Sequence, residues 1–316
     1  MSEDEGMEEL ITEEMLWDRI PEVEGEERAS TYYELSARIY ARGQYDEALA
    51  LAETARDIYS QLGDSAPSEG LAQAYSAIGY NLNQLKRMDE AATAMSKAVE
   101  LLRENKSPIA LELACTLGEW WYSSKKYDKV VETMNECAQE HLVDGNEIGA
   151  ANDLHLIGCA ERELKNYEKA IEAFKEARSL FKRNKEVIHV ARCDQKMASC
   201  LIELGEGELA LETARKAVDV FETGHDHRRE TFASFEFGKA QILLEKYDEG
   251  LATLENVLAI VSEDEPKDFE FILDIESRIA KILRMQGRAD EADEIERRLK
   301  SVQEALEDEP ERDLLT

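Results

Sequence analysis

The 316-residue chain has no run of about 20 apolar residues, the length that a helix needs to cross the hydrocarbon core of a bilayer. It also has no basic, apolar leader, because Met1 is followed by Ser2, Glu3, Asp4 and Glu5. These two absences exclude a membrane-spanning protein and argue against secretion. We therefore expect a cytoplasmic protein without a membrane partner.

Basic residues are scarce relative to acidic ones. The chain contains 38 lysines and arginines against 70 aspartates and glutamates, a formal net charge of −32. Nucleic-acid phosphates and anionic lipids are repelled by such a surface, so nonspecific binding to either is excluded. The charge favours solubility, a basic partner, or mimicry of nucleic acid, and we expect no nucleic-acid partner.

Chemistry-bearing motifs are also missing. The five cysteines form no C-x-x-C pair, which indicates thiols used as small apolar packing groups in a reducing compartment. The five histidines show no recurring metal-ligand spacing, and the Gly205-Glu206-Gly207 segment has no strand before it, as a phosphate loop requires. We predict no metal, no cofactor and no catalytic site, and hence a protein that is not an enzyme.

The chain does contain a strong internal repeat. Residues 166–177 form a turn followed by an amphipathic helix, and six further segments repeat this pattern at steps of 43, 39, 40, 40, 40 and 42 residues. A fixed period of this size predicts a solenoid, in which each unit buries its apolar face against its neighbours. The corresponding turn residues are Tyr45, Met88, Tyr127, Tyr167, Gly207, Tyr247 and Ala289.

Each unit is predicted to contain two helices. Gly43, Gly205 and Gly287 stand where a first helix must end and turn, because glycine tolerates positive φ. The predicted pairs are 29–41 with 46–59, 71–85 with 89–102, 109–123 with 128–140, 148–164 with 168–181, 187–204 with 208–221, 229–244 with 248–261, and 269–285 with 290–300.

Acidic segments flank the predicted array, which covers residues 28–300. Residues 1–27 contain apolar residues at helical spacing before Pro21, which favours a short amphipathic helix. This helix could cap the first repeat, remain part of a frayed tail, or serve as a linear motif for a partner. Residues 301–316 carry six acids and one base and are typical of a frayed or disordered end.

Small residues recur at one phase of the first helices. Glycine stands there in four units, each time after a large apolar residue, although glycine inside a helix costs about 1 kcal/mol relative to alanine. We interpret this recurrence as a packing requirement, since a missing side chain lets two helix backbones approach closely. The four residues are Gly79, Gly118, Gly158 and Gly238.

These features resemble the tetratricopeptide repeat family over about residues 28–300. The resemblance rests on the Leu/Ile-Gly step in the first helix, the tyrosine at the turn, and the ladder of Ala170, Phe174 and Ala177 in the second helix. The period departs from the common family unit of 34 residues, so either the helices are longer or the loops are larger. The family implies an all-α, right-handed solenoid of about seven helix-turn-helix units.

The resemblance also implies a concave groove lined by the first helix of each pair. Positions about 18, 15, 11 and 8 residues before the second-helix alanine would face it. The candidate partner-binding residues are Tyr33, Tyr40, Tyr80, Asn83, Tyr122, Asn152, His155, Arg162, Arg192, Gln195, Phe235, Lys239, Lys281 and Arg284.

Cations in this set are unexpected on so acidic a chain. They either pair with neighbours such as Glu163, Glu203 or Glu236, or they form a site for an acidic or carboxylate-bearing peptide. The main hypothesis is a non-enzymatic adaptor or scaffold that binds a peptide or partner helix. The alternatives are a groove occupied by an acidic tail of the chain itself, an acidic decoy that blocks a nucleic-acid-binding protein, and a peptide-sensing regulator. The sequence does not determine the oligomeric state.

Overall fold

The computed structural model describes residues 12–263 and 268–308, and within them it contains fifteen α-helices, two short 3-10 helices and no strand. The predicted all-α solenoid of seven helix pairs is confirmed. Among the described residues, no helix combines the length and the apolar character needed to cross a membrane. The chain divides into two compact units, Met1–Asn146 and Glu147–Thr316.

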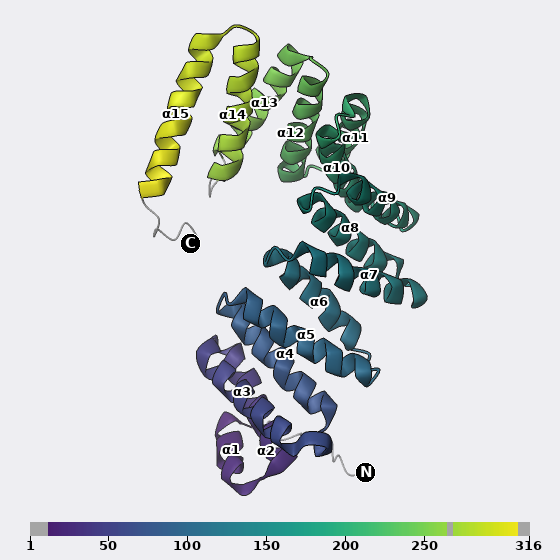
Figure 1. Cartoon of the computed structure of the whole chain (residues 1–316), viewed down its shortest axis with the longest axis vertical. Coiled ribbons are helices and arrows are strands. Elements are labelled where there is room, and N and C mark those ends of the chain that lie inside the picture. Colours follow the sequence, from purple (N-terminus) through teal and green to yellow (C-terminus); the bar gives the residue numbers. More distant parts are fainter. Residues whose placement is uncertain (1–11, 264–267, 309–316) are drawn as a thin grey trace, which may run out of the picture. The chain divides into compact units, whose positions relative to one another are not determined.

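The first unit contains a short leading helix and three helix pairs (Figure 1). The single-turn 3-10 helices Ile20–Glu22 and Gly63–Ser65 lie in two of its connections. Its α-helices are α1 (Glu13–Arg19), α2 (Gly25–Ala41), α3 (Tyr45–Leu62), α4 (Ser68–Gln84), α5 (Met88–Glu104), α6 (Ala110–Ser123) and α7 (Tyr127–Val143).

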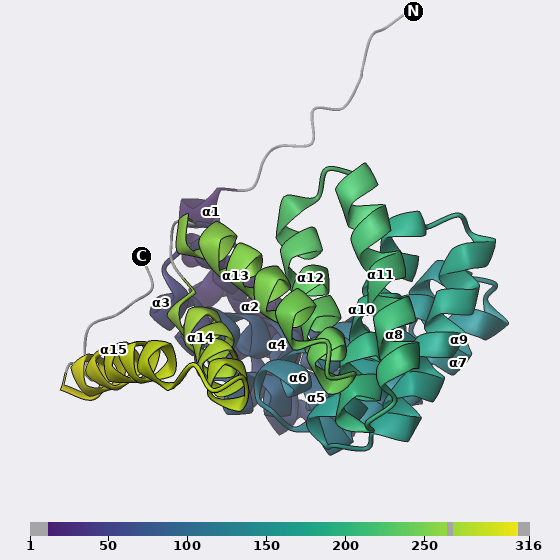
Figure 2. The same ribbon diagram turned by 90° about the horizontal axis from the view of Figure 1, so that it is seen from above.

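The second unit contains four helix pairs. Figure 2 shows its last helix, α15, beside α14 at the C-terminal end of this unit. The helices are α8 (Glu147–Glu163), α9 (Tyr167–Arg183), α10 (Val187–Glu203), α11 (Gly207–Thr223), α12 (His227–Leu243), α13 (Tyr247–Glu263), α14 (Phe269–Met285) and α15 (Ala289–Asp308).

The long period comes from long helices, not from large loops. Each helix from α8 to α13 has 17 residues. The turns between them have three residues, as in 164–166 and 184–186, whether they lie inside a pair or between pairs. Two helices and two turns therefore give 40 residues. The sequence period thus reports helix length directly.

A left-handed residue stands in the middle of each of these turns. Inside the α8–α9 turn, Lys165 has φ of 62°. The preceding helix ends in a Schellman arrangement, since the amide of Asn166 donates to the carbonyl of Glu161 at 2.9 Å. The predicted turn glycines Gly43, Gly205 and Gly287 also have positive φ, of 78°, 78° and 79°, so their role is confirmed.

The helical glycines make room for side chains of the paired helix. A Cβ added to Gly158 would lie 2.6 Å from a ring carbon of Phe174, and one added to Gly118 would lie 2.2 Å from Cε of Met134. Phe174 is fully buried, so its ring has no space into which to move. The predicted packing requirement at this phase of the repeat is therefore confirmed.

Helices also cover the two ends of the array. Leu16 of α1 is fully buried and packs with Leu35 and Ile39 of α2. The described part of residues 1–27 thus contains α1, which packs on the first pair, followed by the 3-10 helix Ile20–Glu22 and the start of α2. At the other end, α15 continues to Asp308, eight residues beyond its predicted end at Lys300. Residues 1–11 and 309–316 of the two acidic tails lie outside the described part of the chain.

Candidate ligand-binding face

The tyrosines predicted in the first unit pack within that unit. The ring of Tyr40 lies 5.3 Å from that of Tyr45, and the ring of Tyr122 lies 5.4 Å from that of Tyr127. In both cases an aromatic residue near the end of a first helix meets the turn tyrosine of its own pair. Both Tyr40 and Tyr122 are only half-buried, which leaves part of each side chain open to solvent.

Three other predicted residues of this unit are also half-buried: Tyr33 on α2, and Tyr80 and Asn83 on α4. Burial raises the pKa of the Tyr33 and Tyr80 hydroxyls, with nearby glutamates adding to the shift. The Tyr80 ring lies edge-on to Trp120 at 5.5 Å. These residues offer apolar contact area without a charged group.

Basic side chains gather on α8 and α10 of the second unit. His155 and Arg162 are seven residues apart on α8, and Arg192 and Lys196 are four residues apart on α10, so each pair lies on one helix face. The two helices are in contact. We call these four residues the cationic cluster. The predicted amides lie nearby in sequence, with Asn152 exposed and Gln195 half-buried.

The charges of this cluster are only partly neutralised. Arg162 forms an ion pair with Glu163 at 2.6 Å. Arg192 and Lys196 form no ion pair with any carboxylate of the described residues, although both are half-buried. Burial lowers the pKa of the Lys196 ammonium, and the positive charges of Arg162 and Arg192 lower it further. Arg192 and Lys196 are therefore held close to one another without a carboxylate counter-ion among the described residues.

His155 is uncharged at neutral pH because it is buried beside positively charged side chains. Burial lowers its pKa to about 3, and Arg192, Lys196, His189 and Arg162 contribute to the shift by repulsion. Its Nε2 atom is buried and has no hydrogen-bond partner within the described chain. Its Nδ1 atom lies 3.8 Å from the sulfur of Cys159. The imidazole is thus a neutral polar group with one unused position.

A pocket of about 330 Å³ lies between α12 and α14. Its apolar lining includes Leu243 and Met285, which are 39% and 56% exposed. Lys281 adds an exposed cation, whereas Lys239 is buried and paired with Glu236 at 2.9 Å. The complete lining is Ile202, Lys239, Ile242, Leu243, Glu245, Tyr247, Arg278, Lys281, Ile282 and Met285. We call this cavity the α12–α14 pocket.

An aromatic cluster supports this pocket. The ring of Phe235, on α12, lies 5.0 Å from that of Phe271, on α14. Lys239 and Arg278 stand over the Phe235 ring at 5.2 and 5.5 Å from its centroid. Phe235 itself is buried, so it can hold these cations in place but offers little surface to a ligand.

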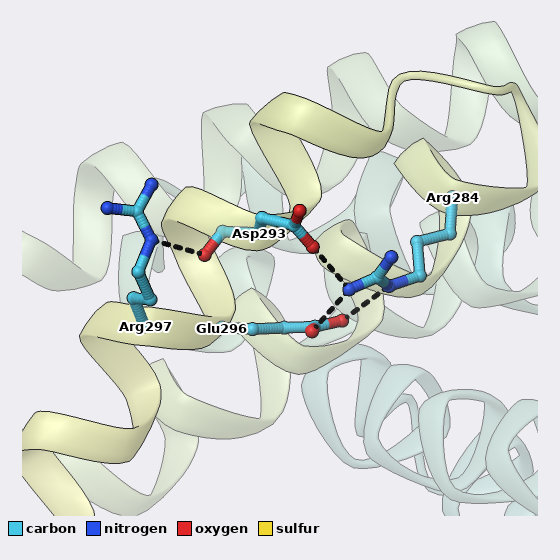
Figure 3. Close-up of polar contacts among 4 residues, drawn as sticks. All are labelled: Arg284, Asp293, Glu296 and Arg297. Atoms are coloured by element: carbon cyan, nitrogen blue, oxygen red, sulfur yellow. Dashed lines mark hydrogen bonds and ion pairs between the residues drawn. The ribbon is translucent and has the colours of Figure 1, made fainter.

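Arg284 is bound within its own helix pair (Figure 3). Its Nε donates to Glu296 at 2.8 Å, and its Nη2 donates to Glu296 at 2.6 Å and to Asp293 at 2.5 Å. These two carboxylates hold the pKa of the guanidinium above its usual range. An acidic ligand would have to displace both of them to reach Arg284.

Sequence reasoning missed Lys196 and Arg278. Lys196 stands 14 residues before Ala210, and Arg278 stands 14 residues before Ala292, where each alanine is the one used to count positions in its second helix. An offset of 14 residues was not among those expected to face the groove. The spacing of Lys196 from Arg192, four residues along one helix, was a usable signal. Of the expected residues, the structure brings His155, Arg162 and Arg192 into one cluster.

The comparisons with known proteins agree with this architecture. The family model "Tetratricopeptide repeat" matches residues 72–105 and 154–182, which lie in the second and fourth helix pairs. No curated protein sequence matches the chain significantly.

Several solved structures share the fold. One of them is a signal transduction ATPase with numerous domains (STAND) from Pyrococcus horikoshii, which has a tetratricopeptide repeat sensor. Its sequence is 17% identical to this chain, and the two structures superpose with a TM-score of 0.65 over 94% of this chain and 45% of that protein. The chain thus spans less than half the length of that protein. The apo form of RapI is 15% identical with a TM-score of 0.57, over 89% of this chain and 99% of that one.

Aspartyl phosphate phosphatase F from Bacillus subtilis is 14% identical with a TM-score of 0.56, over 87% of this chain and 71% of that one. At these identities the likeness shows the fold alone. Together with the two matched segments and the seven helix pairs of the described residues, it shows that this chain contains tetratricopeptide repeats and has the fold of a tetratricopeptide repeat solenoid.

Proposed function

We propose that the chain is a non-enzymatic scaffold that binds an acidic peptide or an acidic partner helix on the first helices of its second unit. The observation that supports this most is the unneutralised pair Arg192 and Lys196 in a chain of net charge −32. A protein with so many carboxylates has ample means to pair two cations internally. Leaving them unpaired and half-buried costs free energy that a bound anion can return.

The side chains of the cationic cluster and of the α12–α14 pocket fit an acidic peptide. Guanidinium groups bind carboxylates in a planar, two-pronged geometry, and the Arg192 guanidinium is not engaged by an internal acid. The α12–α14 pocket adds exposed apolar surface at Leu243 and Met285 for a bulky side chain of the same ligand. The negative charge of the rest of the chain repels an acidic ligand from other parts of the surface, which favours its binding at the cationic cluster.

Fluorescence anisotropy with labelled peptides tests this proposal. The probes are an acetylated, amidated peptide of glutamate and leucine residues and the same peptide with glutamine in place of every glutamate. We expect the acidic peptide to bind and the neutral one to bind at least tenfold more weakly at constant ionic strength. Arg192→Gln should weaken binding of the acidic peptide by about tenfold, the effect of one charge-assisted contact of about 1.4 kcal/mol.

Two control variants separate the cluster from general charge effects. Lys175→Gln removes an exposed cation from α9 and should leave the affinity unchanged. Arg284→Gln should also leave it unchanged, because Arg284 is already held by Glu296 and Asp293. Equal weakening by Arg192→Gln and Lys175→Gln would remove the cluster from the proposal.

A further inference from the structure

The cationic cluster has the charge of a site for a doubly charged anion. Arg162 is paired with Glu163, which leaves Arg192 and Lys196 as two positive charges without a carboxylate partner in the described chain. A single carboxylate would neutralise only one of them. A phosphoryl group carries a charge of about −1.5 to −2 at pH 7 and has three acceptor oxygens. We propose that the cluster binds a phosphoryl group on a side chain of the peptide partner.

This inference rests on the proposed scaffold function and specifies the ligand of the same face. The donors stand on two helices in contact, with Arg162 on α8 and with Arg192 and Lys196 one turn apart on α10. An anion seated between the helices can therefore be contacted from both sides. The Arg192 guanidinium and the Lys196 ammonium, beside the Arg162 guanidinium that is already paired with Glu163, supply more donors than one carboxylate can use, but they match a tetrahedral oxyanion.

Carboxylates of the chain do not compete for this position. Glu236, which acts on Lys196 electrostatically, is paired with Lys239 at 2.9 Å. Asp194, two residues from Arg192 and Lys196, is buried and paired with Arg178 at 2.7 Å. Glu236 and Asp194 are thus satisfied by cations outside the cluster and Glu163 is engaged by Arg162, so the charges of Arg192 and Lys196 remain available to a ligand.

His155 provides a separate indication of a missing partner. Burial raises the pKa of the Cys159 thiol, so the thiol keeps its proton and can donate it to Nδ1 of His155 at 3.8 Å. The imidazole proton then stands on Nε2, a buried donor without an acceptor in the described chain. An anion oxygen held by Arg192 and Lys196, whose long side chains can adjust, supplies that acceptor.

Peptide binding by the full chain distinguishes the phosphoryl group from a carboxylate. The probes are one acetylated, amidated octapeptide that contains phosphoserine, its serine form, and its glutamate form, all at constant ionic strength. We expect the phosphoserine form to bind at least tenfold more tightly than the glutamate form. The preference should disappear in Arg192→Gln and in Lys196→Gln, and it should persist in Lys175→Gln.

The outcomes separate this inference from the proposed function. Equal affinities of the phosphoserine and glutamate forms would overturn the phosphoryl site and leave an acidic-peptide scaffold. Failure of all three forms to bind would overturn both. A preference that survives Arg192→Gln and Lys196→Gln would place phosphoryl recognition elsewhere in the chain and overturn the assignment to this cluster.

A titration with inorganic ions gives a second readout that does not depend on peptide sequence. Phosphate and sulfate are added to the labelled full chain at pH 7.5 while NMR follows the His155 ring, with chloride at matched ionic strength as the reference. We expect saturable shifts of the His155 signals with phosphate and sulfate, and none with chloride. Loss of these shifts in Arg192→Gln supports the site, whereas identical responses to all three ions contradict it.

Discussion

At the scale of single residues, the repeat requires small side chains where helices meet. The sequence already shows this at Gly158, because a helical glycine that recurs at one phase has a cost that only packing explains. The structure identifies the partner as the buried ring of Phe174. The identity of that partner could not be read from the spacing alone, since the contact joins two helices whose crossing is set by the whole pair.

We expect Gly158→Ala to destabilise the chain. The added methyl group would meet the Phe174 ring at 2.6 Å, and the resulting strain of about 1–3 kcal/mol exceeds the gain of about 1 kcal/mol in helix propensity. Urea unfolding measures the change. Ser179→Ala, at an exposed position of α9, serves as the control and should be neutral or slightly stabilising. A Gly158→Ala variant as stable as the control would contradict the packing argument.

The pH dependence of stability should report the position of His155. Its pKa is about 3 in the folded chain against an ordinary value of 6.5, so below pH 6.5 the unfolded chain binds a proton that the folded chain does not. The contribution of His155 is thus present above pH 6.5 and is lost as the pH falls toward 3. Between pH 7.5 and 5.5 the loss is about 1.4 kcal/mol.

Urea unfolding of the wild type and of His155→Gln at these two pH values isolates this effect, because the carboxylates are common to both chains. The wild type should lose more stability than the variant on acidification. Parallel losses would mean that His155 titrates alike in both states, so that neither its burial nor the repulsion by Arg192 and Lys196 shifts its pKa.

At the scale of helices and turns, the sequence predicted the pairs closely and left the basis of the long period open. Its period near 40 left longer helices and larger loops as alternatives, because loop residues between amphipathic segments resemble helix ends. The structure assigns the extra residues to helices of 17 residues joined by three-residue turns. It also extends α15 to Asp308, where the acidic composition had favoured a frayed end.

The turns contain a local conformational cost that can be relieved. Lys165 has φ of 62°, a conformation that costs a residue with a Cβ about 1 kcal/mol relative to glycine. Lys165→Gly should therefore raise the free energy of unfolding by about 0.5–1 kcal/mol. Lys169→Gly, four residues later and exposed inside α9, should lower it by about 1 kcal/mol.

Chemical denaturation of the two variants compares the same substitution in two backbone conformations. Opposite signs are expected at Lys165 and Lys169. A loss of stability at both positions would show that the left-handed conformation of Lys165 carries no appreciable strain.

At the scale of the whole molecule, the cations of the cationic cluster stand out against the strongly negative net charge of the chain. The chain carries −32, yet the first helices of its second unit place Arg192 and Lys196 together without internal counter-ions. The sequence predicted Arg192 through the repeat phase, because each unit presents the same helix positions to the same side. It could not predict which cations would be neutralised, since Arg284 is paired by Glu296 of another helix and Arg192 is not.

The central claim is that the first helices of the second unit hold an acidic ligand. NMR chemical-shift mapping of the full chain during titration with the acidic glutamate–leucine peptide tests it most directly. We predict that the largest perturbations fall on α8, α10, α12 and α14, beginning at His155, Arg192 and Lys196. Perturbations centred on the second helices α9, α11 and α13, or none at saturating peptide, would contradict the claim.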